Sequence, residues 1–254
     1  KIRLIIREDI KHSRFYPLIE FLSSVAGECP HQYFSAQGGS ASGGQDGMRA
    51  SESPIRFSRE EMIVRSKHNY ANQLAEFVTQ GVKDNKDRHE ELQKFMLAND
   101  SVTVATEVPV YLKREDLEHM QTQLGFKLFR KVKNRKSETN PENQNSTYSL
   151  EEMTTADLPK LITGHIDILQ VRNGQIHILD YKPQAAKEKP IEQLTMYALA
   201  LSRLTGLRVY DFKCAWFDEK DYFEFFPLHV VRKSTRKFKR KTVRTKEGVY
   251  RINR

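Results

Sequence analysis

The sequence of 254 residues has few cysteines and no long apolar run, and each shortage excludes a class of protein. Two cysteines, Cys29 and Cys214, are too few for a disulfide framework, a four-thiolate zinc site or an iron–sulfur cluster. No stretch approaches the roughly 18 apolar residues of a transmembrane helix, and the charged N-terminus (KIRLIIREDIKHSRF) is not a secretory signal. We therefore expect a protein of a reducing intracellular compartment, the cytoplasm or nucleoid, without a membrane partner.

Positive charge is distributed unevenly along the chain. Lysine and arginine total 42 against 33 acidic residues, which gives a net charge of +9. Residues 232–254 hold 11 basic residues and one acid, so this segment carries +10 and the remaining 31 basic and 32 acidic residues carry −1. A basic segment on a nearly neutral body attracts polyanions. We expect a solvated, partly disordered tail that contacts nucleic acid. The alternatives are that the tail docks a protein partner or packs as a final strand, for which VYRIN has the alternation. An anionic membrane surface fits less well, because the tail has few large apolar residues.

Composition divides the chain into four parts. Residues 1–36 are expected to form a strand and a helix that belong to the main fold. Residues 37–47 (QGGSASGGQDG) have the composition of a flexible linker, natural or engineered. Residues 48–231 form the main domain, which carries a highly polar insertion at 113–160, and residues 232–254 form the basic tail.

The spacing of apolar residues predicts the regular elements. Intervals of three and four predict a long helix over Ser66–Leu97, which Gly81 can interrupt, and a second over Ile191–Leu204 that ends at Thr205-Gly206. Strands are predicted at Ile2–Ile6, Val102–Leu112, Leu161–Val171, Gln175–Lys182, Val209–Phe217 and Tyr222–Pro227. Further predictions are a helix over Ile10–Val25, helix over 115–132 and a loop over 134–149. Together they indicate an α/β fold with a central mixed β-sheet flanked by helices.

The turn Asn173-Gly174 joins two of these strands and sets their register. A two-residue hairpin loop places positions whose numbers add to 347 opposite each other, so Asp167 faces Asp180, with Lys182 on the same face. Facing carboxylates repel, which requires solvent exposure, a raised pKa on one of them or a bound cation. Apolar neighbours argue against exposure, and we favour Mg²⁺ or Mn²⁺, which prefer oxygen ligands. The alternative is a surface hairpin that Lys182 neutralises.

Two predicted helices carry polar side chains that are further candidates for a functional site. Gln193 and Tyr197 lie four residues apart on one face of a predicted helix whose other face is apolar. His89 lies in a polar stretch of the long predicted helix. Each also has an ordinary explanation: Tyr197 as a half-buried core residue, and His89 as a histidine that binds nothing.

Five segments taken in chain order resemble the RecB-type nucleases of the PD-(D/E)XK superfamily: HEELQKF, TEVPVYL, GHIDILQV, ILDYKP and QLTMYALAL. In that family a helix supplies a histidine, two core strands supply GxxD and DxK, and the next helix bears QxxxY. The segment FLSSVAGECPHQYF is also similar to the family's opening helix and Cys-Pro signature. The resemblance covers residues 19–34 and 81–217, and it implies a restriction-endonuclease-like core.

The resemblance implies a metal site and the residues that form it. The implied ligands are the side chains of His89, Asp167 and Asp180 and the backbone carbonyl of Tyr181, and the implied ion is Mg²⁺ or Mn²⁺. Glu107 matches an acidic position on the strand before the insertion and is an additional candidate near the site.

The resemblance also implies roles in catalysis. Lys182 would be the catalytic lysine, acting with the two aspartates, and Gln193 and Tyr197 would contact the DNA backbone or orient the lysine. Some relatives hold an iron–sulfur cluster with one cysteine near the start and three near the end. Cys29 matches the first, but the C-terminal trio is missing, so we expect no cluster.

We therefore expect a metal-dependent DNA nuclease that acts on single- or double-stranded DNA, exonuclease-like or at strand ends and flaps. Cleavage needs a hydroxide near neutral pH and stabilisation of charge on phosphorus. A metal ion supplies both, while Lys182 orients or deprotonates the water. Two rivals are a binding module with a decayed nuclease core and a subunit active only within a larger recombination, repair or helicase complex. The intact Asp167, Asp180, Lys182 and Gln193 count against decay.

Overall fold

The computed structural model describes residues 3–4, 13–28, 47–57, 61–82, 84–133, 148–231, 242–245 and 248–253. Cys29, nearly all of the linker predicted at 37–47, and most of the predicted loop at 134–149 lie outside these residues. Within the part that is described, no helix is both long and apolar enough to cross a membrane.

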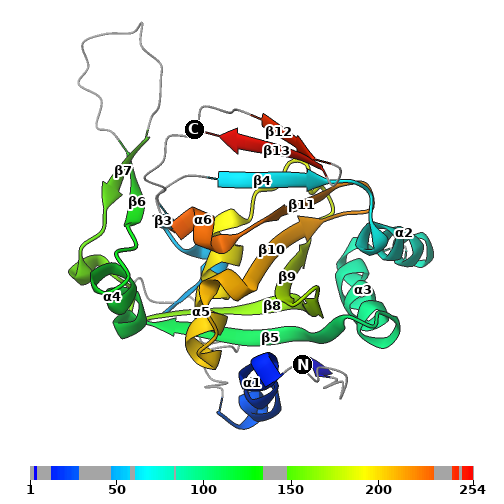
Figure 1. Ribbon diagram of the computed structural model, residues 1–254, viewed down its shortest axis with the longest axis horizontal. Coiled ribbons are helices and arrows are strands. Elements are labelled where there is room, and N and C mark those ends of the chain that lie inside the picture. The colour runs from blue at the N-terminus through cyan, green and yellow to red at the C-terminus, as the bar shows by residue number, and fades with distance from the viewer. Residues whose placement is uncertain are drawn as a thin grey trace, which may run out of the picture.

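A mixed β-sheet forms the centre of the molecule (Figure 1). Its strands in spatial order are β1 (Arg3–Leu4), β5 (Thr103–Lys113), β8 (Leu161–Arg172), β9 (Gln175–Tyr181), β10 (Phe212–Phe217), β11 (Tyr222–Phe225), β4 (Glu61–Ser66), β13 (Gly248–Asn253) and β12 (Thr242–Thr245). The strand β2 (Met48–Arg49) pairs with β8 in parallel, and β9 pairs with β10 in parallel. The other pairings are antiparallel. The mixed sheet predicted from the sequence is confirmed.

Helices cover both faces of this sheet. On one face, α1 (Tyr16–Glu28) and α5 (Ile191–Thr205) pack against alternate strand residues such as Leu169, Ile178 and Trp216. On the other, α2 (Tyr70–Gly81) and α3 (Asn85–Asn99) pack against their neighbours Ile168, Leu179 and Phe217. Helices on both sides of the sheet are as predicted. Strands that are buried on both faces have nearly continuous apolar sequences. Helix α5 ends where expected, with Gly206 at a φ of 72° in the left-handed region.

The long helix predicted over Ser66–Leu97 is wrong in its extent. Ser66 ends β4, and the chain forms two helices, α2 and α3, separated after Gly81. The apolar spacing of threes and fours continues through both helices, so periodicity alone did not reveal the break. A short 3-10 turn at Val209–Asp211 precedes β10, and Pro227 begins a short helix, α6 (Pro227–Val231), so the last two predicted strands are shorter than expected.

The polar insertion contains more structure than its composition suggests. Helix α4 spans Arg114–Thr122 and then stops, and Gly125, with a φ of 66°, reverses the chain. The strands β6 (Leu128–Lys133) and β7 (Tyr148–Glu152) follow. Strand β6 pairs with β7 on one side and with β3 (Ile55–Phe57) on the other, which gives a second sheet in the order β3-β6-β7. The helix predicted over 115–132 is therefore too long. The pairing with β3, about 70 residues away in sequence, is a long-range contact that local patterns do not report.

The hairpin of β8 and β9 has the predicted register. Asn173 and Gly174 have φ angles of 51° and 70°, as a tight two-residue turn of this kind requires. The pairs run from Arg172–Gln175 to Ile168–Leu179, each with numbers that add to 347. The ladder ends there, one pair before Asp167 and Asp180, because β8 continues beside β5 while β9 continues beside β10. The two aspartates therefore lie where the strands separate.

Part of the basic C-terminal segment belongs to the sheet. Strand β13 pairs with β4 from Gly248–Ser66 to Asn253–Glu61, and β12 pairs with β13. A free edge on β4 would offer unpaired backbone groups, and the alternating sequence GVYRIN supplies a partner strand. For residues 242–245 and 248–253 the alternative of packing as a final strand is confirmed, and the expected solvated tail is wrong for this part. Residues 232–241 lie outside the described part.

We predict that deleting residues 242–254 destabilises the protein and promotes self-association. Several backbone hydrogen bonds of about 1 kcal/mol each are lost, so the free energy of unfolding should fall by roughly 2 kcal/mol or more. Thermal unfolding and light scattering measure the two effects. Replacing the basic residues of 232–241 by Gln is the matched control and should leave both unchanged. A truncated chain that melts and scatters like the intact one would show that β13 contributes nothing to stability.

Candidate active site

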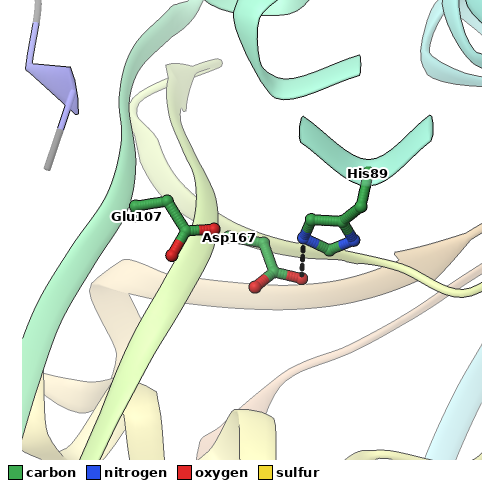
Figure 2. Close-up of side chains that lie close together, drawn as sticks. All are labelled: His89, Glu107 and Asp167. Atoms are coloured by element: carbon green, nitrogen blue, oxygen red, sulfur yellow. Dashed lines mark ion pairs between the residues drawn. The ribbon is translucent and has the colours of Figure 1, made fainter. Parts of the chain in front are cut away.

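Polar side chains from four elements meet at the point where β8 and β9 separate. Helix α3 supplies His89, β5 supplies Glu107, β8 supplies Asp167 and β9 supplies Asp180. Figure 2 shows the first three of these side chains, with His89 directed toward Asp167 and Glu107 beside it. The residues are distant in sequence, and the order β5-β8-β9 in the sheet brings three of them onto adjacent strands.

His89, Glu107 and Asp167 form a cluster of three donors. One ligand atom from each lies within 4.8 Å of the other two, and His89 Nε2 is 3.3 Å from Asp167 Oδ2. Burial disfavours the charged form of His89, but the hydrogen bond to Asp167 and the charges of Asp167 and Glu107 outweigh it and raise the pKa of His89. An imidazole nitrogen and two carboxylates at this spacing can hold a divalent cation.

Glu107 enters the cluster through an irregularity shared by two strands. The pairs Thr106–Ile168 and Val108–Ile166 place it opposite Asp167. Its φ of 54° lies in the left-handed region, which is uncommon for a residue with a Cβ. On β8, Ile166 packs in the α5 layer whereas Ile168 packs in the α3 layer, although regular alternation would put both on one face. The alternation therefore changes at Asp167, which can reach groups from both layers.

The pKa values of Asp167 and Asp180 move in opposite directions. Asp180 is 3% exposed, and burial, a hydrogen bond with Asp167 and the charge of Asp167 raise its pKa well above the ordinary value of 3.8. Burial also opposes ionisation of Asp167, but hydrogen bonds from Asp180 and His89 and the charges of His89 and Lys182 lower its pKa. Asp180 is therefore the more readily protonated of the two. A raised pKa on one aspartate is one of the three ways to relieve the repulsion that the hairpin register implies.

Lys182 lies beside this pair at the end of β9. Its Nζ is 3.0 Å from Asp180 Oδ2, and its backbone N–H donates to the carbonyl of Phe217. Burial lowers the pKa of Lys182, but the charges and hydrogen bond of Asp180, with the charge of Asp167, raise it overall. A cationic lysine can orient water and offset negative charge at once, whereas it must lose a proton before it acts as a base. Its role in catalysis stays a prediction.

Tyr181 supports the site from the α3 side. Its ring meets the ring of His89 edge-on, with centroids 6.1 Å apart, and its hydroxyl donates to Glu219 Oε1 at 2.6 Å. Both contacts belong to the side chain. The role of its backbone carbonyl as a metal ligand stays a prediction.

Gln193 and Tyr197 approach from α5. Gln193 Nε2 donates to Tyr197 Oη at 2.8 Å, and this hydroxyl also forms a hydrogen bond with the backbone of His165. Tyr197 is 6% exposed, and burial raises its pKa, so it stays a neutral phenol. Its burial beside the aspartates fits an orienting role better than direct contact with DNA.

The sequence was compared with models of known protein families. A model of the PD-(D/E)XK nuclease superfamily matches residues 27–246. The chain belongs to the PD-(D/E)XK nuclease superfamily. No curated protein shows significant similarity to it. Membership implies a hydrolase that acts on phosphodiester bonds of a nucleic acid, and the mixed sheet with flanking helices is the fold expected of such a nuclease.

The donor set of this nuclease fits a divalent metal. PD-(D/E)XK nucleases typically use such ions, and His89, Glu107 and Asp167 offer the nitrogen and oxygen atoms that Mg²⁺ or Mn²⁺ binds. Asp180 forms a hydrogen bond with Asp167 and an ion pair with Lys182 but is not one of these three donors. The predictions that Asp180 is a ligand and that Glu107 is an additional candidate stay predictions, and the structure brings Glu107 to within 4.8 Å of donors of His89 and Asp167.

The sequence missed three residues that position the site. Gln93 donates to Glu107, and Asp218 Oδ2 accepts the backbone N–H of Ala185 in the loop after Lys182. Gly164 lies against Tyr197, where a Cβ would stand 2.3 Å from the ring carbon Cε1. The spacing of Gln93, one helical turn after His89, is a signal that could have been used. Gly164 is the glycine of the GxxD segment, but its contact with Tyr197, like that of Asp218 with Ala185, joins distant parts of the chain and has no local pattern.

We predict that Gly164→Ala displaces Tyr197 and impairs the nuclease. The added methyl group cannot coexist with the present ring position, and overpacking of this kind costs about 1–3 kcal/mol. Nucleic-acid cleavage should fall about tenfold or more, and thermal unfolding should show the loss of stability. Gly47→Ala is the control, since its Cβ would lie an ordinary 3.9 Å from the Leu161 carbonyl. Wild-type melting and turnover in Gly164→Ala would contradict the close contact.

Proposed function

We propose that this protein is a divalent-metal-dependent DNA nuclease of RecB type, which hydrolyses phosphodiester bonds at strand ends or flaps. The observation that carries the proposal is the convergence of His89, Glu107 and Asp167 next to the ion pair of the buried Asp180 and the half-buried Lys182. The assembled site also argues against a decayed nuclease that only binds, because each motif side chain has a specific partner here.

The metal would be held by the cluster of His89, Glu107 and Asp167, with Asp180 joining when it gives up its proton. When bound, Mg²⁺ or Mn²⁺ lowers the pKa of its water toward neutrality and polarises the phosphate. His89 would contribute only as the neutral imidazole, through a ring nitrogen that carries no proton. The side chains thus have to release protons before they bind the ion.

Lys182 would act on the substrate rather than on the metal. Its ammonium group is held by Asp180 in the half-buried wall of the site, where a fixed positive charge stabilises a phosphorus centre that gains negative charge. Tyr197 and Gln193 hold one another and the backbone before Asp167, so they keep β8 in place against α5.

DNA is the proposed substrate, on two grounds. The resemblance of the motifs is to RecB-type nucleases, and the segment 232–254 carries +10 of charge that can contact phosphates. The resemblance itself does not distinguish exonucleases from endonucleases, and the preference for ends is tested with the closed circle in the assay below. Action within a larger recombination or repair complex is the second candidate, with the same chemistry and a partner that delivers the strand.

An assay of the isolated chain tests this proposal. Labelled single-stranded DNA, double-stranded DNA and RNA of one sequence are incubated with Mg²⁺, Mn²⁺ or a chelator, and a covalently closed circular DNA is included. We expect cleavage of linear DNA that needs the metal and spares the circle. Cleavage with the chelator present would overturn the metal-dependent mechanism. Faster cleavage of RNA would overturn the substrate, and cleavage of the circle would overturn the end preference.

We predict that Lys182→Ala abolishes most of the cleavage while folding and DNA binding stay near normal. Loss of a group that stabilises transition-state charge typically costs ~10² to 10³ in rate. Single-turnover cleavage and a binding assay give the two quantities. Lys187→Ala, an exposed lysine of the following loop, is the control and should cleave normally. Unchanged turnover in Lys182→Ala would remove Lys182 from the mechanism.

We predict that metal affinity falls as the pH drops through the raised pKa of Asp180, because the proton competes with the ion. Calorimetric titration with Mn²⁺ across the pH range measures this effect. Asp180→Asn should bind Mn²⁺ at least tenfold more weakly and with less dependence on pH. Asp116→Asn, which removes a surface carboxylate paired with Arg203, should behave like the wild type. Equal affinities for wild type and Asp180→Asn would contradict a shared site.

Without metal, the raised pKa of Asp180 predicts that the folded protein becomes less stable as the pH rises. The folded chain holds the Asp180 proton more tightly than the unfolded chain does. This stabilisation is complete below the ordinary pKa of aspartate and is lost as pH rises through the raised pKa of Asp180. Asp180→Asn keeps a hydrogen-bond donor and cannot ionise, so at neutral pH and without metal it should melt higher than the wild type. A gain of about 1 kcal/mol corresponds to roughly 2–4 °C.

A further inference from the structure

Gln93 is a buried amide beside the candidate metal site. It is 4% exposed and lies one helical turn after His89 on α3, so both side chains project toward the sheet. Its Nε2 is 2.5 Å from Oε1 of Glu107. A carboxylate only accepts hydrogen bonds, so the amide must direct its NH₂ group toward Glu107.

Glu107 occupies a position where such a contact matters. Its left-handed backbone interrupts an otherwise extended strand between the pairs Thr106–Ile168 and Val108–Ile166. Residues with a Cβ keep this conformation only where their surroundings hold them in it. Gln93 is a neutral donor that reaches the Glu107 carboxylate from the opposing helix. The hydrogen bond joins α3 to β5 at the level of the cluster.

We propose that Gln93 is a positioning residue for the metal centre. Its amide holds Glu107 so that a carboxylate oxygen stands within 4.8 Å of the donor atoms of His89 and Asp167. Gln93 does not touch the ion, and the inference rests on the metal site of the proposed function. A carboxylate has lone pairs on both oxygens, so accepting one N–H leaves it able to bind a cation. One helix thus supplies a ligand, His89, and the group that orients a second ligand.

The test replaces the amide and measures metal binding. Gln93→Met keeps an unbranched side chain of similar length without an N–H donor, and Gln93→Leu serves as a second variant if the first does not fold. Hydrogen bonds that orient a metal ligand typically contribute 10–100-fold in affinity. Calorimetric titration of the full chain with Mn²⁺ should therefore give a Kd about tenfold weaker or more. Circular dichroism without metal checks that each variant is folded.

Two comparisons separate positioning from a general disturbance of the helix. Lys94→Met alters the next residue, which faces Glu90 and Glu91 at the surface of α3, and should leave the Kd unchanged. In a Glu107→Ala background, adding Gln93→Met should change the Kd less than twofold, because the group that Gln93 orients is already gone. A loss of affinity that recurs in the double variant would show that Gln93 acts by holding α3, and the inference would be overturned.

A kinetic measurement gives an independent readout. If Gln93 only orients a ligand, cleavage by Gln93→Met should fall at low Mn²⁺ and recover as the Mn²⁺ concentration is raised. A rate that stays low at saturating metal would contradict positioning through Glu107.

The Mn²⁺ affinity of Asp167→Asn tests the metal site itself. If this variant binds Mn²⁺ as the wild type does, the ion is held elsewhere and both the proposed function and the role of Gln93 fail. If binding depends on Asp167 but not on Gln93, only the role of Gln93 fails.

Discussion

The site depends on the repulsion between two neighbouring carboxyl groups, of which that of Asp180 is buried and that of Asp167 is partly exposed. The Asn173-Gly174 turn sets a register that brings Asp167 and Asp180 together, and the separation of β8 from β9 gives them room for a hydrogen bond. Burial prevents solvent from screening the repulsion, so a positive partner has to compensate. A proton on Asp180, the ammonium group of Lys182 and the imidazole of His89 share this task. Because these carboxylates concentrate negative charge away from solvent, the site favours the binding of a divalent cation.

The two helical layers contribute to the site in different ways. Helix α3 brings His89 and Gln93 to the carboxylates from one side, while α5 brings Tyr197 against Gly164 and the backbone of His165 from the other. Asp167 lies where the alternation of β8 changes, so it can interact with both layers. This change interrupts the regular geometry of the sheet. Opposite it on the neighbouring strand, the backbone of Glu107 lies in the left-handed region. Strain of this kind is tolerated where surrounding contacts hold it in place.

The peripheral elements complete the sheet and extend it. The hairpin of β12 and β13 covers the edge of β4, and the insertion forms its own sheet with β3. Both additions join segments far apart in the chain, and both contain basic residues that composition alone assigned to a tail or a polar loop. Backbone pairing therefore outweighed the polar composition, because an unpaired strand edge leaves hydrogen-bonding groups unsatisfied.

The amino-acid sequence by itself determined the local features: the hairpin and its register, the start and end of α5, the strands β5, β8 and β9, and the motif residues His89, Asp167, Asp180 and Lys182. Asn-Gly, β-branched runs and apolar spacing express preferences of neighbouring residues, so they can be read without a fold. Only the tertiary structure decided which donors converge. Glu107 joined His89 and Asp167, Gln93 and Gly164 gained contacts with site residues, and burial beside Asp167 raised the pKa of Asp180. Each of these outcomes depends on burial and on contacts between residues far apart in the chain, which no local pattern encodes.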